Sequence, residues 1–333
     1  MTKTASPFQK VIMMYFLGTI LSESILKNPD ALALKEKSFD LVMLETYFYQ
    51  EPLLAFAHHF GCPAININPF GYSPQLNEFT GGNINPAYVP NVFGGGVRLD
   101  TFLERLENTV TTVFAMLGNH LYWYPKMNAL MHEVFPNAPH IYDLMTNVSL
   151  TLINNHPALM APVALAPSVM EIGGIHIKPG KPLPADLKKW IEESKDGFVY
   201  FSLGSNIRPE LLAADRRDAI FKSFGKLKQR VLVKWNAELP PNPPANCRFE
   251  DWVPQQEVLA HPNLKVFVTH GGLLSTQESV YFGAAIVGMP VFGDQDMNMK
   301  MAVQKGFGQM VSFYNLKSED LDAALQEVIY NPK

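Results

Sequence analysis

The chain has 333 residues, of which 47% are hydrophobic and 17% charged, so it can bury a large core and form two domains. A formal net charge of -4 provides no basic field for a phosphate backbone, which argues against nucleic acid as a partner. The only cysteines are Cys62 and Cys247, far apart in sequence, and this excludes a disulfide scaffold and a cysteine-rich metal site.

The chain starts with a basic segment and an apolar run at residues 11–21, which has the length of a signal-peptide core. The polar residues 22–24 and a helix-like stretch at 25–37 follow without a clean cleavage site, so a buried helix is favoured. Apolar runs of about 18 residues are absent, and no membrane-spanning helix is expected. The sequon Asn147-Val148-Ser149 is a weak indication of a secreted context.

The first half contains one clear βα unit, with a strand predicted at 39–45, a helix at 52–61 and a second strand at 63–67. Residues 71–100, rich in Gly, Asn and Pro, predict a long loop that serves as a lid or a substrate wall, and residues 101–135 predict helix. The Pro-rich stretch 178–186 marks the boundary between an N-terminal domain, 1–184, and a C-terminal domain, 185–333.

From Phe198 onward, short β-branched runs alternate with amphipathic stretches, a pattern typical of βαβ units around a parallel sheet. The C-terminal domain is therefore predicted to be doubly wound. The predicted strands are 198–203, 231–235, 264–270, 285–290 and 307–313, and the predicted helices are 209–229, 255–261, 273–283, 296–306 and 318–330.

Polar residues follow three of these strands: Gly204-Ser205-Asn206, His270-Gly271-Gly272 and Phe292 to Gln295. Because an open parallel sheet binds ligands at the carboxyl ends of its strands, all three are expected on one rim. His270 and its glycines directly precede a helix, whose free N–H groups and positive dipole end favour a phosphate.

Other side chains nearby suit the remaining parts of a nucleotide. Ser275 offers a hydroxyl in the first turn of that helix, and Glu278 has the acceptor pair for vicinal ribose hydroxyls. Trp252 provides a flat face for a base and Gln255 an amide for its edge, while Asp294 with Gln295 suits sugar hydroxyls. Each feature alone is more simply a turn or a core residue, and only their co-occurrence indicates a nucleotide site. Neither the Walker A pattern nor the dinucleotide fingerprint is present.

Three motifs in register, W-V-P-Q-Q-x-x-L-x-H-P at 252–262, F-V-T-H-G-G-x-x-S-x-x-E at 267–278 and G-M-P-x-F-G-D-Q-x-x-N at 288–298, resemble the donor signature of animal UDP-glycosyltransferases. The segment 271–278 is similar to the insect members, and 39–45 and 201–205 extend the resemblance over nearly the whole chain. The resemblance implies an α/β fold of the GT-B type, with two Rossmann-like domains, the sugar nucleotide on the C-terminal one, and an incomplete acceptor-binding N-terminal domain.

The resemblance also implies roles by position. Trp252 stacks on the uracil and Gln255 bonds to it, Glu278 holds the ribose, and Asp294 with Gln295 holds the sugar. His270, Gly272, Ser275 and Ser205 belong to the phosphate side, and Lys234 is a further donor-binding residue. No metal and no cofactor are implied, and the partners are UDP-glucose or UDP-glucuronate and a small lipophilic acceptor.

Three positions depart from the family pattern. Leu274 replaces an Asn that commonly follows the phosphate-binding His by four residues, so one phosphate donor is missing. Ala285 stands where a Pro is usual, which loosens a turn, and Lys234 stands where many relatives have Arg, which keeps the charge without the fork.

In this family a His near the N-terminus takes the proton of the acceptor hydroxyl, oriented by a carboxylate just after the 39–45 strand. Glu45 occupies the carboxylate position, but the 38 residues before Phe39 contain no His, and His58 or His59 is only a weak substitute. The chain is therefore expected to be truncated at its start, and at its end before a membrane-spanning helix. By resemblance, the location is the lumenal side of the endoplasmic reticulum membrane.

The leading hypothesis is a UDP-hexose glycosyltransferase that transfers glucose or glucuronate, with inversion, to a hydroxyl of a small lipophilic acceptor. The missing base motivates the alternative of a non-catalytic UDP-sugar-binding fragment. A dinucleotide-dependent oxidoreductase with a degenerate fingerprint is disfavoured, because Glu278 lies within a helix and does not match the acidic ribose partner of that class.

Overall fold

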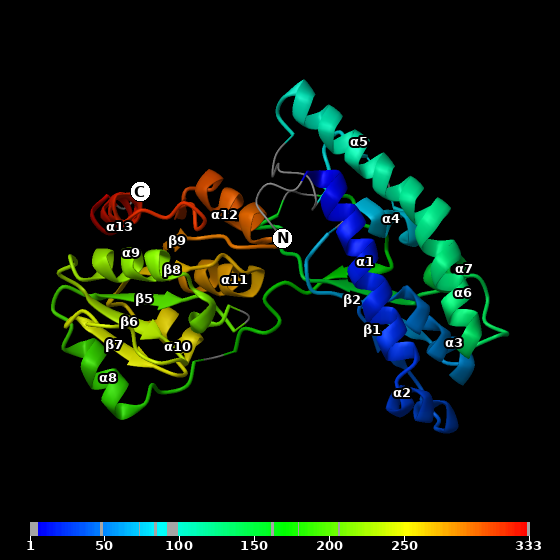
Figure 1. The fold of residues 1–333 in the computed structure, drawn as a ribbon, viewed down its shortest axis with the longest axis horizontal. Coiled ribbons are helices and arrows are strands. Elements are labelled where there is room, and N and C mark those ends of the chain that lie inside the picture. The colour runs from blue at the N-terminus through cyan, green and yellow to red at the C-terminus, as the bar shows by residue number, and fades with distance from the viewer. Residues whose placement is uncertain are drawn as a thin grey trace. The chain divides into compact units, whose positions relative to one another are not determined.

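The computed structural model describes residues 6–46, 49–72, 74–82, 85–91, 99–160, 163–178, 180–205 and 207–331. The chain divides into two compact units, Met1–Gly173 and Gly174–Lys333 (Figure 1). The division falls before the boundary expected at 184/185. The reason is local: the backbone N–H groups of Lys178 and Lys181 donate to the side chains of Gln256 and Glu257, at 3.0 and 3.1 Å, so this Pro-rich segment packs on the second unit.

The first unit is built on a four-stranded parallel sheet in the order β1-β2-β3-β4. Its strands are β1 (Val42–Leu44), β2 (Ala64–Asn68), β3 (Leu150–Ile153) and β4 (Val169–Glu171). The first two confirm the predicted βα unit. The other two, β3 and β4, were not predicted.

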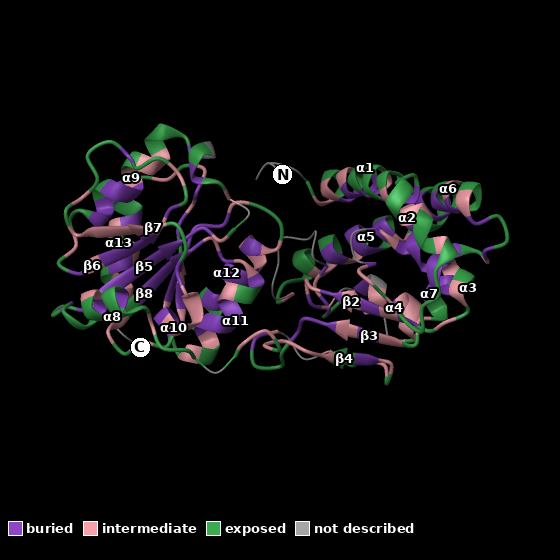
Figure 2. Ribbon diagram, turned by 90° about the horizontal axis from the view of Figure 1, so that it is seen from below, coloured by how far each residue is buried: buried purple, intermediate pink, exposed green. Residues whose placement is uncertain are grey.

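Helices pack around this sheet (Figure 2). They are α1 (Pro7–Leu26), α2 (Pro29–Ala33), α3 (Ala55–Phe60), α4 (Pro74–Thr80), α5 (Phe102–Gly118), α6 (Tyr124–Val134) and α7 (Ile141–Thr146), with 3-10 turns at Leu34–Glu36 and Glu51–Leu54 and a π-helical turn at Asn119–Trp123.

Two expectations for this unit need adjustment. The apolar run at 11–21 lies in α1, which starts at a capping box between Ser6 and Gln9, but only one face of the helix is buried while Ile12 and Phe16 are exposed. The stretch 71–100 is not loop throughout, because α4 forms within it. Residues 83–84 and 92–98 of that stretch, where a lid was expected, lie outside the described residues.

The second unit is a doubly wound domain, as predicted, with a six-stranded parallel sheet in the order β10-β9-β8-β5-β6-β7. Its central strands are purple in Figure 2, because helices cover both of their faces. The strands are β5 (Phe198–Ser202), β6 (Arg230–Lys234), β7 (Cys247–Glu250), β8 (Leu264–Thr269), β9 (Ile286–Gly288) and β10 (Gly308–Met310).

The helices of this unit follow the predicted alternation with two differences. They are α8 (Ala185–Glu192), α9 (Ala214–Phe224), α10 (Gln255–Leu259), α11 (Leu273–Phe282), α12 (Gln295–Gln304) and α13 (Ser318–Tyr330). The helix predicted at 209–229 is shorter, because Pro209–Leu211 form a separate 3-10 turn before α9. Helix α8 and strand β7 were not predicted.

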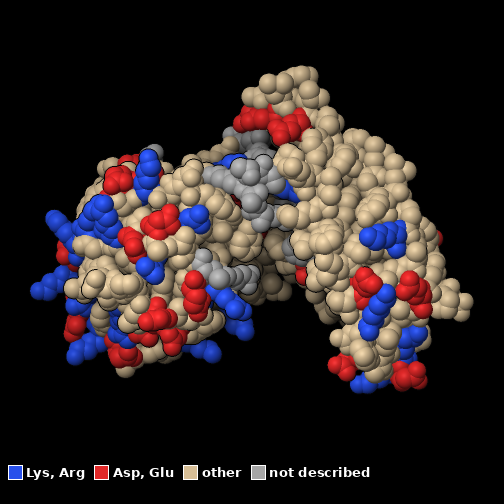
Figure 3. Space-filling model, in the orientation of Figure 1, with Lys and Arg blue, Asp and Glu red and all other residues tan. Residues whose placement is uncertain are grey.

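Basic and acidic side chains are interspersed on the face of the second unit seen in Figure 3. Among the helices in the described part of the chain, none is long and apolar enough to cross a membrane.

Candidate functional site

The strand register of the second unit brings the predicted site segments to one edge of its sheet. Ser202, the last residue of β5, pairs with Thr269 of β8, which in turn pairs with Gly288 of β9. The segments that follow, at 203–205, 270–272 and 289–295, therefore leave the sheet at the same carboxyl edge. Asn206 lies outside the described residues.

His270 directly follows β8 and lies at this carboxyl edge of the sheet. Gly204 and Gly272 lie so close to its ring that a Cβ on either would come within 2.6 to 2.7 Å of an imidazole atom. Burial, together with the nearby charge of Lys234, lowers the pKa of His270 to about 4. The imidazole is therefore neutral near pH 7, and its shielded Nδ1 has no hydrogen-bond partner among the described residues.

Helix α11 begins immediately after His270, with Gly272 as its N-cap. Gly271 has a φ of +81°, a conformation that glycine adopts without strain, and this turn aims the first N–H groups of the helix at the edge of the sheet. Leu274 and Ser275 lie in the first turn, and the Leu274 side chain is 53% exposed. The helix end can hold an anion, with a hydrocarbon side chain beside it.

Glu278 lies one turn deeper in α11 and is only 6% exposed. Its Oε2 accepts from Gln255 Nε2 at 2.5 Å and its Oε1 from Gln256 Nε2 at 2.8 Å. Gln255 also donates to Ser275 Oγ at 3.0 Å, and its Oε1 accepts from the Tyr200 hydroxyl at 3.2 Å. The amide of Gln255, expected to face a base, is thus engaged within the protein and holds the carboxylate in place.

Asp294 and Gln295 lie at the start of α12. Burial raises the pKa of Asp294, against the effect of hydrogen bonds from Asn298 and the backbone of Leu273. Asn298 Nδ2 donates to Asp294 Oδ2 at 2.6 Å and to the Gly271 carbonyl at 3.0 Å, which ties this loop to the start of α11. Gln295 Oε1 accepts the N–H groups at 291 and 292, so its amide nitrogen is what it can offer to a ligand.

Trp252 follows β7 and is 73% exposed, with Lys234 Nζ 4.4 Å from the centroid of its ring. Lys234 ends β6 and also donates to the Gly204 carbonyl at 3.3 Å. Through these two contacts, the Lys234 ammonium group connects the Trp252 ring with Gly204, which lies next to the His270 ring. Ser205, beyond Gly204, is exposed.

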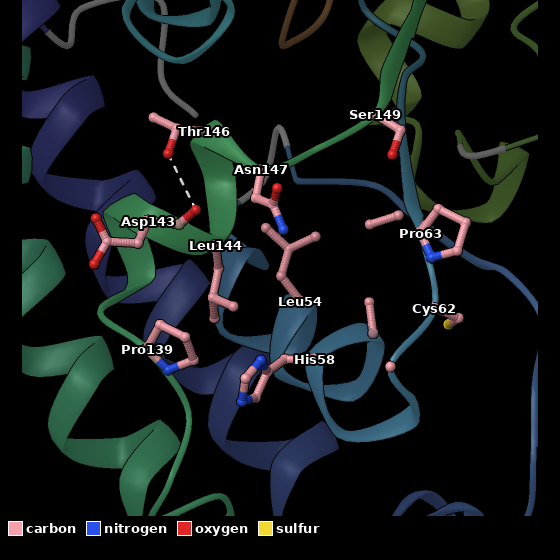
Figure 4. Close-up of a pocket in the computed structure, with 13 residues that line it drawn as sticks. Leu54, His58, Cys62, Pro63, Pro139, Asp143, Leu144, Thr146, Asn147 and Ser149 are labelled. Atoms are coloured by element: carbon pink, nitrogen blue, oxygen red, sulfur yellow. Dashed lines mark hydrogen bonds between the residues drawn. The ribbon is translucent and has the colours of Figure 1, made fainter.

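The first unit holds the proposed orienting carboxylate but not a base beside it in the described residues. Glu45 directly follows β1, burial raises its pKa, and its Oε1 is shielded without a hydrogen-bond partner among the described residues. His58 lies in α3 at the other end of the sheet. There it lines a cavity of about 670 Å³ with Pro63 and Ser149, which precede β2 and β3 (Figure 4).

The adjacent His59 is also exposed, and one of its ring nitrogens contacts the Lys35 carbonyl at 2.9 Å. The geometry therefore does not favour His58 or His59 as a substitute base, since His58 is at the amino edge of the sheet and Glu45 at the carboxyl edge.

Sequence reasoning assigned no role to four side chains that build this site: Tyr200, Gln256, Asn298 and His176. Gln256 and Asn298 are part of the quoted motifs, and Asn298 lies four residues after Asp294, where side chains on a helix meet. Tyr200 lies in a predicted strand without a signal of its own. His176 comes from the start of the second unit, and only the folded chain shows its contact.

The parallel sheets and this edge, with an exposed aromatic ring, a glycine-bounded helix end and buried carboxylates, define an α/β protein with a candidate ligand site at the carboxyl ends of its second sheet. The model of the family "UDP-glucoronosyl and UDP-glucosyl transferase" matches residues 2–333, and the chain belongs to this family. The sequence-based assignment is confirmed.

Among curated relatives, a protein of Dactylopius coccus named UDP-glycosyltransferase UGT5 is 37% identical over 298 residues, covering 89% of this chain and 56% of that protein. Human UDP-glucuronosyltransferase 2B7 is 30% identical over 300 residues, covering 90% of this chain and 56% of the relative. The chain thus spans little more than half the length of these relatives.

Solved structures confirm the GT-B fold class. The glycosyltransferase VinC in complex with DTDP gives a TM-score of 0.65 at 16% identity, covering 98% of this chain and 73% of that one. The spinosyn forosaminyltransferase SpnP gives 0.64 at 15% identity, covering 94% and 75%. At these identities the likeness concerns the fold alone.

Proposed function

We propose that this chain acts as a UDP-sugar-dependent glycosyltransferase that moves glucose or glucuronate, with inversion, onto a hydroxyl of a small lipophilic acceptor. The observation that carries the proposal is the carboxyl edge of the second sheet, where Trp252, His270, Glu278 and Asp294 come from four separate elements of one unit. In this proposal the second unit binds the donor, the first binds the acceptor, and no metal or cofactor takes part.

The donor is proposed to lie along this edge with uracil on Trp252, the ribose hydroxyls on Glu278, and the diphosphate at the start of α11. Ionised Glu278 accepts hydrogen bonds from hydroxyl groups, which suits the vicinal pair of a ribose. The sugar then reaches Asp294 and Gln295. Ser205 and Lys234 flank the diphosphate, the latter as a point charge.

Transfer consists of attack by the acceptor oxygen on the anomeric carbon while the bond from that carbon to the diphosphate breaks. UDP leaves with the bonding electron pair, and negative charge grows on its terminal phosphate. The N–H groups at the start of α11 and Lys234 stabilise this charge. A neutral His270 ring can donate one N–H to the same oxygens without requiring a low pH.

The acceptor proton must pass to a base as the new bond forms. We propose Glu45 as the carboxylate that orients an imidazole base, because its shielded Oε1 has no partner among the described residues. An orienting carboxylate raises the basicity of the imidazole and fixes its tautomer. The family assignment further supports a role in detoxification on the lumenal side of the endoplasmic reticulum membrane.

The test is titration calorimetry of the 333-residue chain with UDP, followed by transfer assays with UDP-glucose and UDP-glucuronate on phenolic acceptors. Trp252→Ala should lower the affinity for UDP, whereas Tyr281→Ala, at a residue of α11 that is 69% exposed, should leave it unchanged. A chain that binds no UDP would overturn the donor-site proposal. UDP binding without transfer would restrict the chain to donor binding.

A further inference from the structure

The joining segment, which we define as residues 174–178 and 180–181 at the start of the second unit, contacts the candidate ribose-binding carboxylate. Ile177 N donates to the Gly174 carbonyl at 2.9 Å, and Gly174 has a φ of +87°, so residues 174–177 form a tight turn. This turn places His176 Nε2 3.5 Å from Glu278 Oε1. Nothing in the donor signature includes this histidine.

The ring of His176 is well shielded. Neither Nδ1 nor Nε2 is exposed to solvent, and neither has a hydrogen bond of ordinary geometry. A buried imidazole N–H and a buried carboxylate at this distance attract each other: the imidazole would otherwise lack a partner, and the carboxylate gains a third donor beside Gln255 and Gln256. The contact is long for a hydrogen bond, so a small shift of Glu278 toward or away from a ligand alters it directly.

Gln256 reinforces the same connection. Its Nε2 donates to Glu278 Oε1 at 2.8 Å and to the His176 carbonyl at 3.3 Å, and its Oε1 accepts from Lys178 N at 3.0 Å. One amide therefore holds both the carboxylate and the backbone of the joining segment. Lys181 N, further along, donates to Glu257 Oε1 at 3.1 Å, so the segment is fastened to α10 at two points.

These contacts control the charge and the orientation of Glu278. Burial alone would raise its pKa, but interactions with His176, Gln255 and Gln256 hold the pKa below its usual value. The carboxylate is therefore ionised near neutral pH. Its two oxygens have about four lone-pair directions in all. Gln255 occupies one on Oε2, and Gln256 and the His176 contact take those on Oε1, which leaves the open side of Oε2 for the ribose.

We propose that His176 is a positioning residue for the donor: it fixes the Glu278 carboxylate in the orientation that receives the ribose hydroxyls. Through Gln256, which contacts His176 and Lys178, the joining segment becomes part of the proposed donor site. The inference rests on the proposed function, because it assigns Glu278 to ribose. It goes beyond that function in one respect: because His176 acts through Glu278, its loss should lower the affinity only for ligands that have ribose hydroxyls.

The experiment measures dissociation constants by calorimetry for UDP and for 2′,3′-dideoxy-UDP, with the 333-residue chain and its His176→Ala and His176→Gln variants. We expect His176→Ala to weaken UDP binding about five- to tenfold and dideoxy-UDP binding less than about twofold. His176→Gln keeps an N–H donor near Glu278 and should recover most of the UDP affinity. Ile175→Ala, at a neighbouring residue that is 73% exposed, is the matched control.

Equal losses for both nucleotides in His176→Ala would overturn the inference, since His176 would then support only the fold. Unchanged UDP affinity would overturn it as well. If His176→Ala does not fold, an unrestored UDP affinity in a folded His176→Gln variant overturns it. These results leave the proposed function standing as long as the unchanged chain binds UDP, whereas an unchanged chain without UDP binding overturns both.

Discussion

Lys234 Nζ lies 4.4 Å from the centroid of the Trp252 ring, so the exposed tryptophan of the candidate donor site already takes part in a cation–π pair. The ammonium covers the ring on one side and also donates to the Gly204 carbonyl, next to His270. A base stacked on Trp252 would therefore share the ring with a charge that reaches toward the diphosphate.

The first prediction concerns this pair. Trp252→Ala should weaken UDP binding by about 1–3 kcal/mol, because stacking of a base on an aromatic side chain is worth about that much. Trp252→Phe should retain most of the affinity. Calorimetry with UDP and with inorganic diphosphate checks the cause: the loss should be confined to UDP. An equal loss for diphosphate would contradict a role in stacking.

The second prediction concerns the contact between Gly204 and His270. A Cβ at Gly204 would lie 2.6 Å from His270 Cε1, and the φ of +76° adds backbone strain. Gly204→Ala should therefore displace the imidazole, lower the melting temperature and abolish measurable UDP binding. Gly283→Ala is the matched control, since its φ is +68° but a Cβ there meets nothing within 4 Å.

Gly283→Ala should cost only about 1 kcal/mol of backbone strain, with unchanged UDP affinity. Comparable effects of the two substitutions on UDP binding would show that strain, rather than the contact with His270, decides the result.

The convergence of the candidate site segments could be predicted from sequence because strand ends in a parallel sheet meet at one edge. His270 and Asp294 are separated along the chain, yet each follows a strand, and Asn298 connects the two regions through Gly271. The alternation of β-branched runs with helices was long and regular enough to reveal this unit. The predicted edge is the one that the register shows.

Other features have no local signal. Strand β7, Cys247–Glu250, has no β-branched residue to signal it in the sequence, and it forms because the neighbouring strand β6 supplies its hydrogen bonds. The hydrogen bonds of Gln255 with Tyr200, Ser275 and Glu278 form only because α10 packs beside β5 and α11 in the folded chain. His176 is similar, because its distance to Glu278 is set by the path of the whole joining segment.

The third prediction restores a missing phosphate donor. Leu274 lies in the first turn of α11, at the helix end proposed to bind the diphosphate, and its side chain is 53% exposed, so an amide there needs no new burial. Leu274→Asn should tighten UDP binding about threefold to tenfold, since a hydrogen bond to a charged group is worth about 1.5 kcal/mol or more before side-chain ordering.

The control for this substitution is Leu274→Ala, which removes the leucine without adding a donor. It should change the affinity for UDP by less than about twofold, which corresponds to less than about 0.5 kcal/mol. If alanine tightens binding as much as asparagine, steric relief rather than a new hydrogen bond is responsible.

The fourth prediction concerns Glu51, a carboxyl that is 7% exposed in the core of the first unit. Burial raises its pKa to about 8, against a hydrogen bond from Trp123 Nε1 at 3.2 Å to Oε2. Between about pH 4.5 and pH 8, the folded chain therefore keeps a proton on Glu51 that the unfolded chain, with a pKa near 4.5, has already released. The stabilisation from this proton is fully present below about pH 4.5 and declines as the pH approaches about 8.

Thermal unfolding should accordingly show lower stability of the chain at pH 8 than at pH 5, by a few kcal/mol from this group alone. Glu51→Gln keeps an oxygen acceptor for Trp123 but cannot ionise, so it should remove this part of the pH dependence and be more stable than the unchanged chain at pH 8. Glu36→Gln, at an exposed carboxylate, should preserve the original slope. Equal slopes for Glu51→Gln and the unchanged chain would mean that Glu51 is ionised in the folded state, with water or a rearranged side chain compensating its charge.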